Sequence, residues 1–255
     1  MSGGPSSSGQ TSPPTSKAPP TPPPAPTPGE CRALTYTDIG LYSNPNEPVS
    51  CSKDHTAYTF AVESLPDDVA FSGVEIQNDA VQQAASQSCE HDFRRFIGGD
   101  TATRALSRLT VTYFLPKQVG FDLGAHWVRC DVVALQSANS LAPLPTRPEG
   151  ILDDEGALRD FGVCSRGEPG AEGALLLMCT QDHDYRAVAA LRLGTADAAY
   201  PGADQTLTQG KDQCQQLIAE QLGISGGFTF GWTYPSESDW QSGQRFGYCW
   251  KQTSH

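Results

Sequence analysis

Long hydrophobic runs and clusters of basic residues are both missing from this chain of 255 residues. A membrane-spanning helix needs about 20 consecutive apolar residues. The longest apolar run here, Ala174–Cys179, is short enough to be a buried strand. With a formal net charge of −12, the chain is also a poor match for nucleic acid or an anionic membrane surface, which both attract Lys and Arg. We therefore expect neither to be a direct partner.

The first 29 residues lack aromatics and contain a single charged side chain, Lys17, but they hold ten of the twenty prolines. Such a segment has nothing to bury, so chain entropy favours an extended, solvated state. We predict that residues 1–29 form a disordered tether rich in Pro, Ser and Thr. The opening MSGGPSSSG is similar to the start of a mature bacterial lipoprotein, with Met1 at the place of the lipidated cysteine. An ordinary disordered N-terminus is the alternative.

CxxC pairs are missing as well, although the chain has eight cysteines. Structural zinc sites usually take their ligands from such close pairs, so we expect no metal and no cofactor. An even number of widely spaced cysteines is typical of disulfides that form in an oxidising compartment. The sequence therefore predicts an extracytoplasmic protein with four disulfides.

The chain contains one pattern written twice. CSKDH begins at Cys51 and CTQDH begins at Cys179, and the segments 116–130 (PKQVGFDLGAHWVRC) and 235–249 (PSESDWQSGQRFGYC) align without a gap. The cysteines correspond in order, and small differences in spacing are what loop-length changes produce. A period this long indicates a duplicated module and not a solenoid.

Each copy has a readable order of elements. A short strand holds the first cysteine, the second cysteine begins another strand, a helix follows, and two strands close the module. In the first copy Asn78 is placed to cap the helix and Gly98 to end it. The predicted fold class is α+β, with two tandem, small, disulfide-stapled modules, each roughly ββαββ with one helix on an antiparallel sheet. The expected boundaries are 1–29 for the tether, 30–136 for module 1, 137–159 for a linker and 160–252 for module 2.

Four cysteines per module allow three connectivities, and spacing alone does not select one. We expect the first to pair with the second, because they lie on neighbouring strands. The third, on the buried face of the helix, would then pair with the fourth on the sheet below. The expected disulfides are Cys31–Cys51, Cys89–Cys130, Cys164–Cys179 and Cys214–Cys249, with none joining the modules.

These motifs resemble the septum-formation domain of cell-envelope proteins and lipoproteins from actinobacteria. GEC at 29–31 and GVC at 162–164 match the start of that domain, CSKDH and CTQDH match its second element, and DWQSGQRFGYC matches its end. The first copy departs by having Phe121 where tryptophan is usual. The resemblance implies an extracytoplasmic, membrane-anchored protein tied to septum formation or cell division. It carries no residue-level activity.

The recurring Asp-His pairs, Asp54-His55 and Asp182-His183, are the only repeated candidates for reactive chemistry. A histidine oriented by a carboxylate can act as a general base, a metal ligand or a pH sensor. Adjacent strand residues point to opposite faces, however, so neither aspartate is placed to orient its neighbour. We therefore expect buried, structural histidines. One histidine per module is also too few for a metal site.

Most aromatics occupy matching positions in both copies, which favours core packing. Tyr248 and Trp250 differ, because their counterparts are Arg129 and Asp131. We expect these two aromatics to form an exposed binding surface specific to the second copy.

Two short motifs carry less weight. GISGG at 223–227 matches a nucleophile-elbow pattern but has a helix before it and a strand after it, the reverse of what that site requires. LDDEG at 152–156 lacks the spaced acidic positions of a calcium loop and is expected to be a solvated linker.

The sequence shows no acid, base and nucleophile that belong together, so we expect a protein that is not an enzyme. The first hypothesis is a lipid-anchored interaction or scaffold protein. Its partners would be cell-envelope or divisome proteins or cell-wall polymer, and it would meet the membrane only through the lipid anchor. The alternative is a ligand- or glycan-binding protein that uses the cleft between the modules. An envelope hydrolase is the third.

Overall fold

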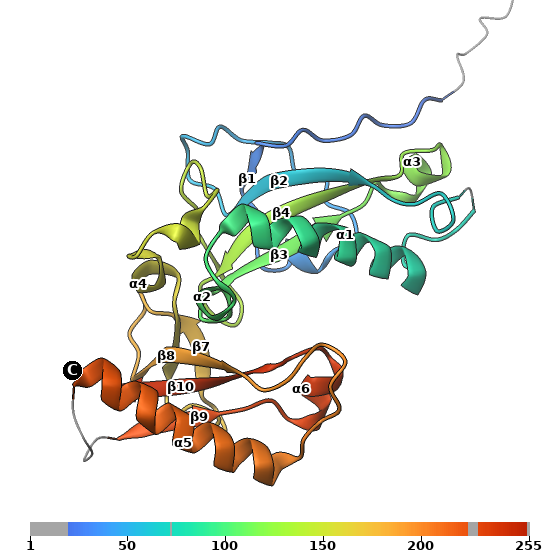
Figure 1. Cartoon of the computed structure of the whole chain (residues 1–255). Coiled ribbons are helices and arrows are strands. Elements are labelled where there is room, and N and C mark those ends of the chain that lie inside the picture. The colour runs from blue at the N-terminus through green and yellow to red at the C-terminus, as the bar shows by residue number, and fades with distance from the viewer. Residues whose placement is uncertain (1–19, 72, 224–228, 254–255) are drawn as a thin grey trace, which may run out of the picture.

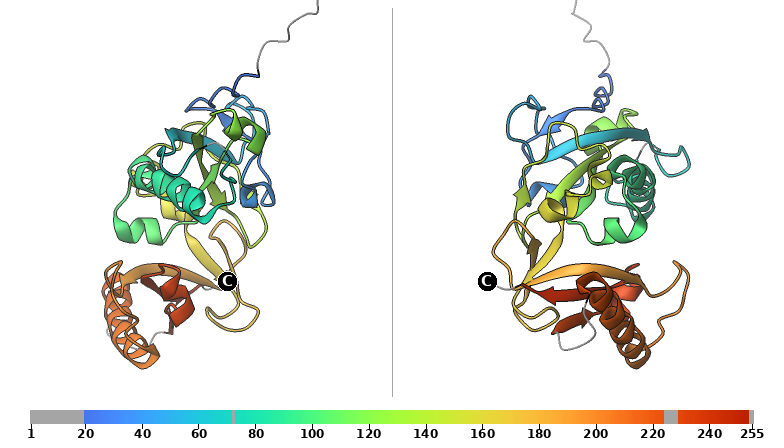
Figure 2. Two further views of the ribbon diagram at one scale, coloured as in Figure 1. Left: turned by 90° about the vertical axis from the view of Figure 1, so that its right-hand side faces the viewer. Right: turned by 60° about the vertical axis from the view of Figure 1, so that its left-hand side comes forward.

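The computed structural model describes residues 20–71, 73–223 and 229–253. The protein is α+β and contains two antiparallel sheets, one in each half of the chain, and one long helix packs on each sheet (Figure 1). The first half contains strands β1 to β5 and the second half contains β6 to β10. The two sheets lie one above the other and are separate, as the rotated views in Figure 2 show.

The first half has the strand order β1-β2-β4-β3, with β5 paired to β4. The long helix α1 packs on β2, β3 and β4. The elements are β1 (Cys31–Arg32), η1 (Asp38–Gly40), β2 (Ala57–Ser64), α1 (Asp79–Ile97), α2 (Thr101–Ala105), β3 (Leu109–Phe114), α3 (Gln118–Asp122), β4 (Trp127–Leu135) and β5 (Leu141–Ala142).

The second half has the strand order β7-β6-β8-β10-β9, and its long helix α5 packs on β8, β9 and β10. Two short helices, η2 (Ile151–Asp153) and α4 (Ala157–Phe161), precede the second half in the chain. Its elements are β6 (Val163–Arg166), β7 (Leu175–Met178), β8 (Tyr185–Arg192), α5 (Ala203–Leu222), β9 (Phe230–Thr233), α6 (Glu237–Gln241) and β10 (Phe246–Gln252).

Two local details differ from the sequence expectation. Cys51 and Cys179 lie in turns, because β2 begins only at Ala57 and β8 only at Tyr185. The apolar run that was expected to be a buried strand forms β7, an extra strand at the edge of the second sheet, where Leu175 and Leu176 are 47% and 46% exposed. Its edge position explains the exposure, since only β6 pairs with it among the described strands.

Helix α1 follows its sequence signals. The Asn78 side chain accepts a hydrogen bond from the Ala80 N–H at 2.9 Å, and Gly98 ends the helix with a φ of 71°. Residues spaced along one face, including Val81, Ala85 and Cys89, are fully buried against the sheet. The helix is therefore held by a cap at one end and by an apolar stripe along its length.

Helix α5 also buries one face, through Cys214 and Ile218. Leu207 is 43% exposed. It lies in the second turn of the helix, beyond the part of α5 that packs with the disulfide against the sheet.

The two halves are joined by backbone hydrogen bonds and by shared side-chain packing. Val163 N–H donates to the Leu106 carbonyl at 2.9 Å, and Met178 N–H donates to the Gln136 carbonyl at 2.9 Å. The Leu106 side chain packs with Trp250 of the second half, and Met178 packs into a cluster of the first half. The halves are thus in direct contact through their interiors.

Residues 137–159 contribute β5, η2 and α4. Leu152 is buried beside Ile97, and the Asp153 carboxylate accepts a hydrogen bond from Gly99 N–H at 2.7 Å. The LDDEG motif is therefore partly packed against α1 and its C-terminus. The expectation that this motif is solvated was wrong for Leu152, because its side chain completes the core beneath the end of α1.

A candidate binding cavity between the two halves

The disulfides pair first with second and third with fourth in each half. They are Cys31–Cys51, Cys89–Cys130, Cys164–Cys179 and Cys214–Cys249. This is the pairing expected from the sequence, and each of these bridges stays within its own half. Cys89 and Cys214 reach from the buried faces of α1 and α5 to β4 and β10, so each helix is covalently attached to the sheet on which it packs.

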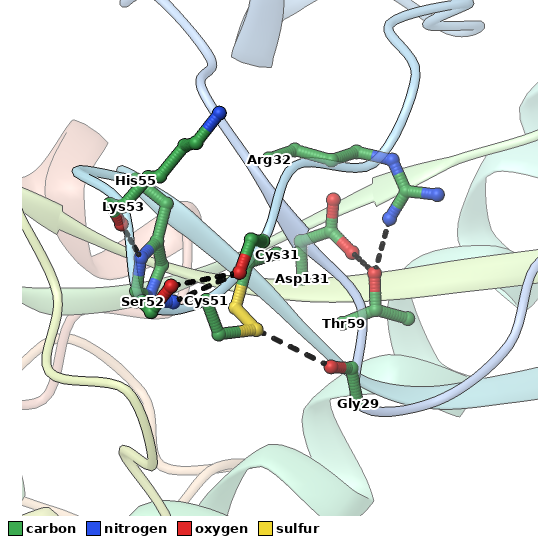
Figure 3. Close-up of a disulfide and its surroundings, with 10 residues drawn as sticks. Gly29, Cys31, Arg32, Cys51, Ser52, Lys53, His55, Thr59 and Asp131 are labelled. Carbon is green, nitrogen blue, oxygen red and sulfur yellow. Dashed lines mark hydrogen bonds between the residues drawn. A yellow bond between two sulfur atoms is a disulfide. The ribbon is translucent and has the colours of Figure 1, made fainter.

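The two histidines have the same local geometry. Nδ1 of His55 lies 2.8 Å from the Lys53 carbonyl, and Nδ1 of His183 lies 2.7 Å from the Gln181 carbonyl (Figure 3 shows the first). Because a carbonyl only accepts, Nδ1–H is the donor in both rings and Nε2 carries the lone pair. His55 is 2% exposed and its Nε2 is enclosed without a partner among the described residues, whereas His183 is half-buried.

The neighbouring aspartates do not orient these rings. Asp54 and Asp182 are both exposed. The Nδ1–H of each histidine instead donates to the backbone carbonyl two residues earlier. Among the described residues, no group of three His, Cys, Asp or Glu side chains is arranged to hold a metal ion. The bond from each histidine Nδ1–H to a backbone carbonyl therefore closes the turn after the second cysteine of each half. Neither histidine forms an acid-base pair with its neighbouring aspartate.

On the sheet face away from α1, the first half buries a network of charged side chains. Arg129 Nε lies 3.0 Å from Asp131 Oδ2, and the Thr59 hydroxyl donates to Asp131 Oδ1 at 2.7 Å. Arg32 in turn donates to Thr59 Oγ1 at 2.7 Å (Figure 3). It also donates to Glu30 at 2.5 Å. Burial raises the pKa of Asp131, and the attraction of Arg129 opposes that rise. The pKa of Arg129 is lowered by the same burial.

In the second half the same positions are aromatic or small. Thr59 lies opposite Asp131 in the first sheet, and Ala187 lies opposite Trp250 in the second. Trp250 is only 1% exposed, and its indole N–H donates to Thr233 Oγ1 at 2.8 Å. The expectation that Trp250 is exposed was therefore wrong, because Leu106 of the first half packs over it.

Tyr248 is half-buried and faces a cavity of about 470 Å³. This cavity is bounded by the end of α2 and the start of β3 from the first half, and by β6, β7, β10 and the segment after β9 from the second. Residues that give it its chemical character include Ser107, Arg108, Leu176, Tyr234, Phe246 and Tyr248, with Trp250 at its base.

The cavity combines aromatic walls with one cationic group. Arg108 Nε donates to the Leu135 carbonyl at 2.9 Å, which fixes the guanidinium at the rim. Burial raises the pKa of Tyr248 and lowers the pKa of Arg108. At neutral pH the phenol is therefore a neutral hydroxyl beside a cation, given the ordinary pKa values of these side chains. The carboxylate of Asp239 also lines the cavity, so the lining suits a ligand with flat apolar surface and neutral hydroxyl or carbonyl groups.

Loop length explains why the part of this face beside Tyr248 and Trp250 is hollow, whereas the matching part beside Arg129 and Asp131 is covered. The first two cysteines are 20 residues apart in the first half and 15 in the second. The longer loop lies over the charged network, where the Ile39 carbonyl accepts from the Thr112 hydroxyl at 3.2 Å and the Tyr42 carbonyl accepts from Leu115 N–H at 2.8 Å. In the second half the shorter loop folds into the β6–β7 hairpin and leaves the cavity beside it.

Sequence reasoning named Tyr248 and Trp250 but missed Arg108 and the β6–β7 hairpin. The signal that pointed to the site was the replacement of Arg129 and Asp131 by aromatics at the matching positions. Arg108 had no such signal, because it reaches the cavity from the other half of the chain. Residues 224–227 of the GISGG motif lie outside the described residues, and Gly223 follows the end of α5.

No helix among the described residues is both long and apolar enough to cross a bilayer. No curated protein and no solved structure matches the chain. A protein-family model described as septum formation matches residues 28–249, a span that includes both halves. The disulfides and this match indicate an extracytoplasmic protein with a role linked to septum formation. The chain belongs to the septum-formation family.

Proposed function

We propose that this protein is a non-catalytic interaction protein of the cell envelope, and that it recognises its partner through the cavity between its two halves. The observation that supports this is the cavity of about 470 Å³ lined by Tyr248 and Arg108. Ligand sites favour such junctions, where a few polar groups converge on an apolar lining. The partner is a cell-envelope or divisome protein, or cell-wall polymer.

A co-purification from native envelope tests this function. The wild-type protein is compared with Tyr248→Ala, with Arg108→Gln and with a control, Asp54→Ala, whose side chain is exposed and is not part of the cavity lining. We expect both cavity variants to lose partners that the wild type and the control retain, while all four keep the same melting temperature within a few degrees. Equal recovery of partners by every variant contradicts the proposal.

A glycan ligand is the second candidate, because the cavity walls carry Tyr234, Phe246 and Tyr248. Aromatic faces offer flat apolar surface, and hydroxyl and guanidinium groups can fix a ligand's orientation. Titration of the wild type and of Tyr248→Ala with soluble cell-wall fragments separates a glycan or cell-wall polymer bound in the cavity from a protein partner. Heat of binding that disappears in Tyr248→Ala supports the glycan. Protein partners without such binding support an envelope or divisome protein as the partner.

We also propose that the protein is held at the membrane by a lipid on its N-terminus, with residues 1–29 as a spacer. At about 3.1 Å per residue, an extended proline-rich segment of this length reaches roughly 90 Å. Mass spectrometry of the N-terminal peptide from the native host tests the anchor. A peptide with two or three acyl chains is expected, and an unmodified N-terminus contradicts it.

A hydrolase remains the third hypothesis, and the histidine geometry weighs against it. Both rings donate to backbone carbonyls and neither is oriented by its neighbouring aspartate. Incubation with purified cell wall is expected to release no soluble fragments. Release that His183→Ala abolishes would establish catalysis and overturn the non-catalytic assignment.

A further inference from the structure

A second concave surface lies on the first half, away from the cavity between the halves. It is a groove of about 360 Å³ between the loop at 43–45, the end of β3, helix α3 and the start of β4. Its walls are mostly apolar and include Pro45, Leu115, Pro116, Leu123 and Trp127. Ser43 helps to shape it, since its hydroxyl donates to the Pro116 carbonyl at 2.9 Å.

The leader of the chain touches this groove. Pro23 is one of the residues that line it, and the leader rejoins the sheet at Gly29, whose N–H donates to the Thr59 carbonyl at 2.8 Å. A Cβ added at Gly120 would lie 2.7 Å from Cγ of Pro23 and 2.9 Å from its Cδ. Gly120 does not have a positive φ, so the backbone there accepts other residues. It is the approach of the proline ring that requires glycine.

The groove has the chemistry of a site for proline-rich segments. Residues 20–28 read PTPPPAPTP, a composition that favours the polyproline II conformation, in which backbone carbonyls remain free to accept hydrogen bonds. Recognition sites for such segments are grooves lined by aromatic side chains. Trp127 provides such an aromatic wall.

We propose that this groove is a binding site for proline-rich segments in the polyproline II conformation, and that the chain's own leader occupies it through Pro23. The leader then leaves the folded body at the groove and not at Gly29, which shortens the proposed spacer by the residues between Pro23 and Gly29. Because only a few residues connect Pro23 to the first strand, the effective concentration of the leader at the groove is in the millimolar range. A free peptide of the same sequence competes poorly unless the leader is released.

The test follows the indole N–H signal of Trp127 by NMR in the full-length protein. In one variant Pro22, Pro23 and Pro24 are replaced by Ser, and we expect the Trp127 signal to shift. Addition of a synthetic peptide with the sequence of residues 20–28 should return the signal towards its wild-type position in this variant, and should leave the wild type unchanged up to about 1 mM. A peptide with Ser in place of its prolines is the matched control.

A second variant tests the groove without altering the leader. Gly120→Ala places a methyl group where the Pro23 ring lies, and we expect it to shift the Trp127 signal in the same direction as the proline changes. Combined with those changes, it should weaken peptide binding at least tenfold. Gly40→Ala is the control, because a Cβ there meets no atom within 4 Å.

Two results would overturn the proposal. One is a Trp127 signal that stays at its wild-type position in both the proline variant and Gly120→Ala. The other is peptide binding that Gly120→Ala does not weaken, which would place the peptide elsewhere. Chemical shifts of residues in β2 and β4 report whether each variant retains the native fold, so that a general loss of structure is distinguished from release of the leader.

Discussion

The two halves use the same sheet face in opposite ways. In the first half this face carries the buried Arg129–Asp131 ion pair beneath the protein's own loop, and in the second it carries Tyr248 and Trp250 beside a cavity. The register that places Asp131 opposite Thr59 places Trp250 opposite Ala187. The scaffold is thus shared, and a difference in one loop decides whether the face is covered or lines a cavity.

The strongest way to break this comparison is to remove one member of the buried ion pair. We expect Asp131→Ala to lower the free energy of unfolding by about 3–5 kcal/mol, because it leaves Arg129 buried without its partner. Trp250→Ala, at the matching position, is expected to lose a similar amount, about 3–5 kcal/mol, for a different reason, a void in the core. Denaturant unfolding measures both. A loss below about 1 kcal/mol for Asp131→Ala would show that the pair contributes little, as exposed pairs do.

Removal of the helix-to-sheet disulfides tests whether the halves are equally dependent on them. The bridges Cys89–Cys130 and Cys214–Cys249 close loops of similar length, with sequence separations of 41 and 35. Replacing both cysteines of either bridge with Ala is expected to cost about 3 kcal/mol. Thermal unfolding of the two double variants provides the comparison. A difference above about 1.5 kcal/mol would mean that helix packing, and not loop closure, sets the dependence.

The two histidines allow a comparison of the halves in which the expected losses of stability are smaller. His55→Ala removes a buried ring and its hydrogen bond to the Lys53 carbonyl, so we expect a loss of about 1–3 kcal/mol. His183 makes the same bond but is half-buried, and His183→Ala should cost less than about 1 kcal/mol. Melting temperatures measure both, and neither change should affect partner binding. Loss of binding with unchanged stability in His55→Ala contradicts the structural role.

The smallest effect concerns the short helices at matching positions, α3 and α6. The Ser236 hydroxyl and backbone N–H both donate to Asp239, at 2.7 and 2.9 Å, and lower its pKa. Because the folded-state pKa is lower than the unfolded value of about 3.9, the ionised carboxylate stabilises the fold above that pH. This stabilisation is lost as the pH falls through the folded-state pKa. Gly120 occupies the matching position in α3.

Asp239→Ala should therefore weaken stability at neutral pH by less than about 1 kcal/mol and should reduce the fall in stability below pH 4. Urea unfolding at several pH values measures this. If the free energy of unfolding of Asp239→Ala falls below pH 4 as steeply as that of the wild type, other carboxylates determine the acid sensitivity.

The sequence predicted the parts of the fold that local patterns determine. The cysteine order, the Asn78 cap and the Gly98 terminus led to the α+β class and to one helix per sheet. They also led to the disulfide pairing. The exposed edge position of strand β7 and the buried position of Trp250 were not predicted, because both depend on contacts between segments far apart in sequence. The same holds for the cavity, since Arg108 reaches Tyr248 only when the halves pack together.

The disulfide Cys31–Cys51, which lies where the chain enters the first sheet, affects how the protein responds to a pulling force. A pull on the leader reaches Cys31 and passes through the sulfur bridge to Cys51. Tension then continues towards β2 and bypasses the intervening loop. Residues 32–50 therefore lie outside the load path, and the loop that covers the buried charges remains in place while the disulfide and β2 carry the force.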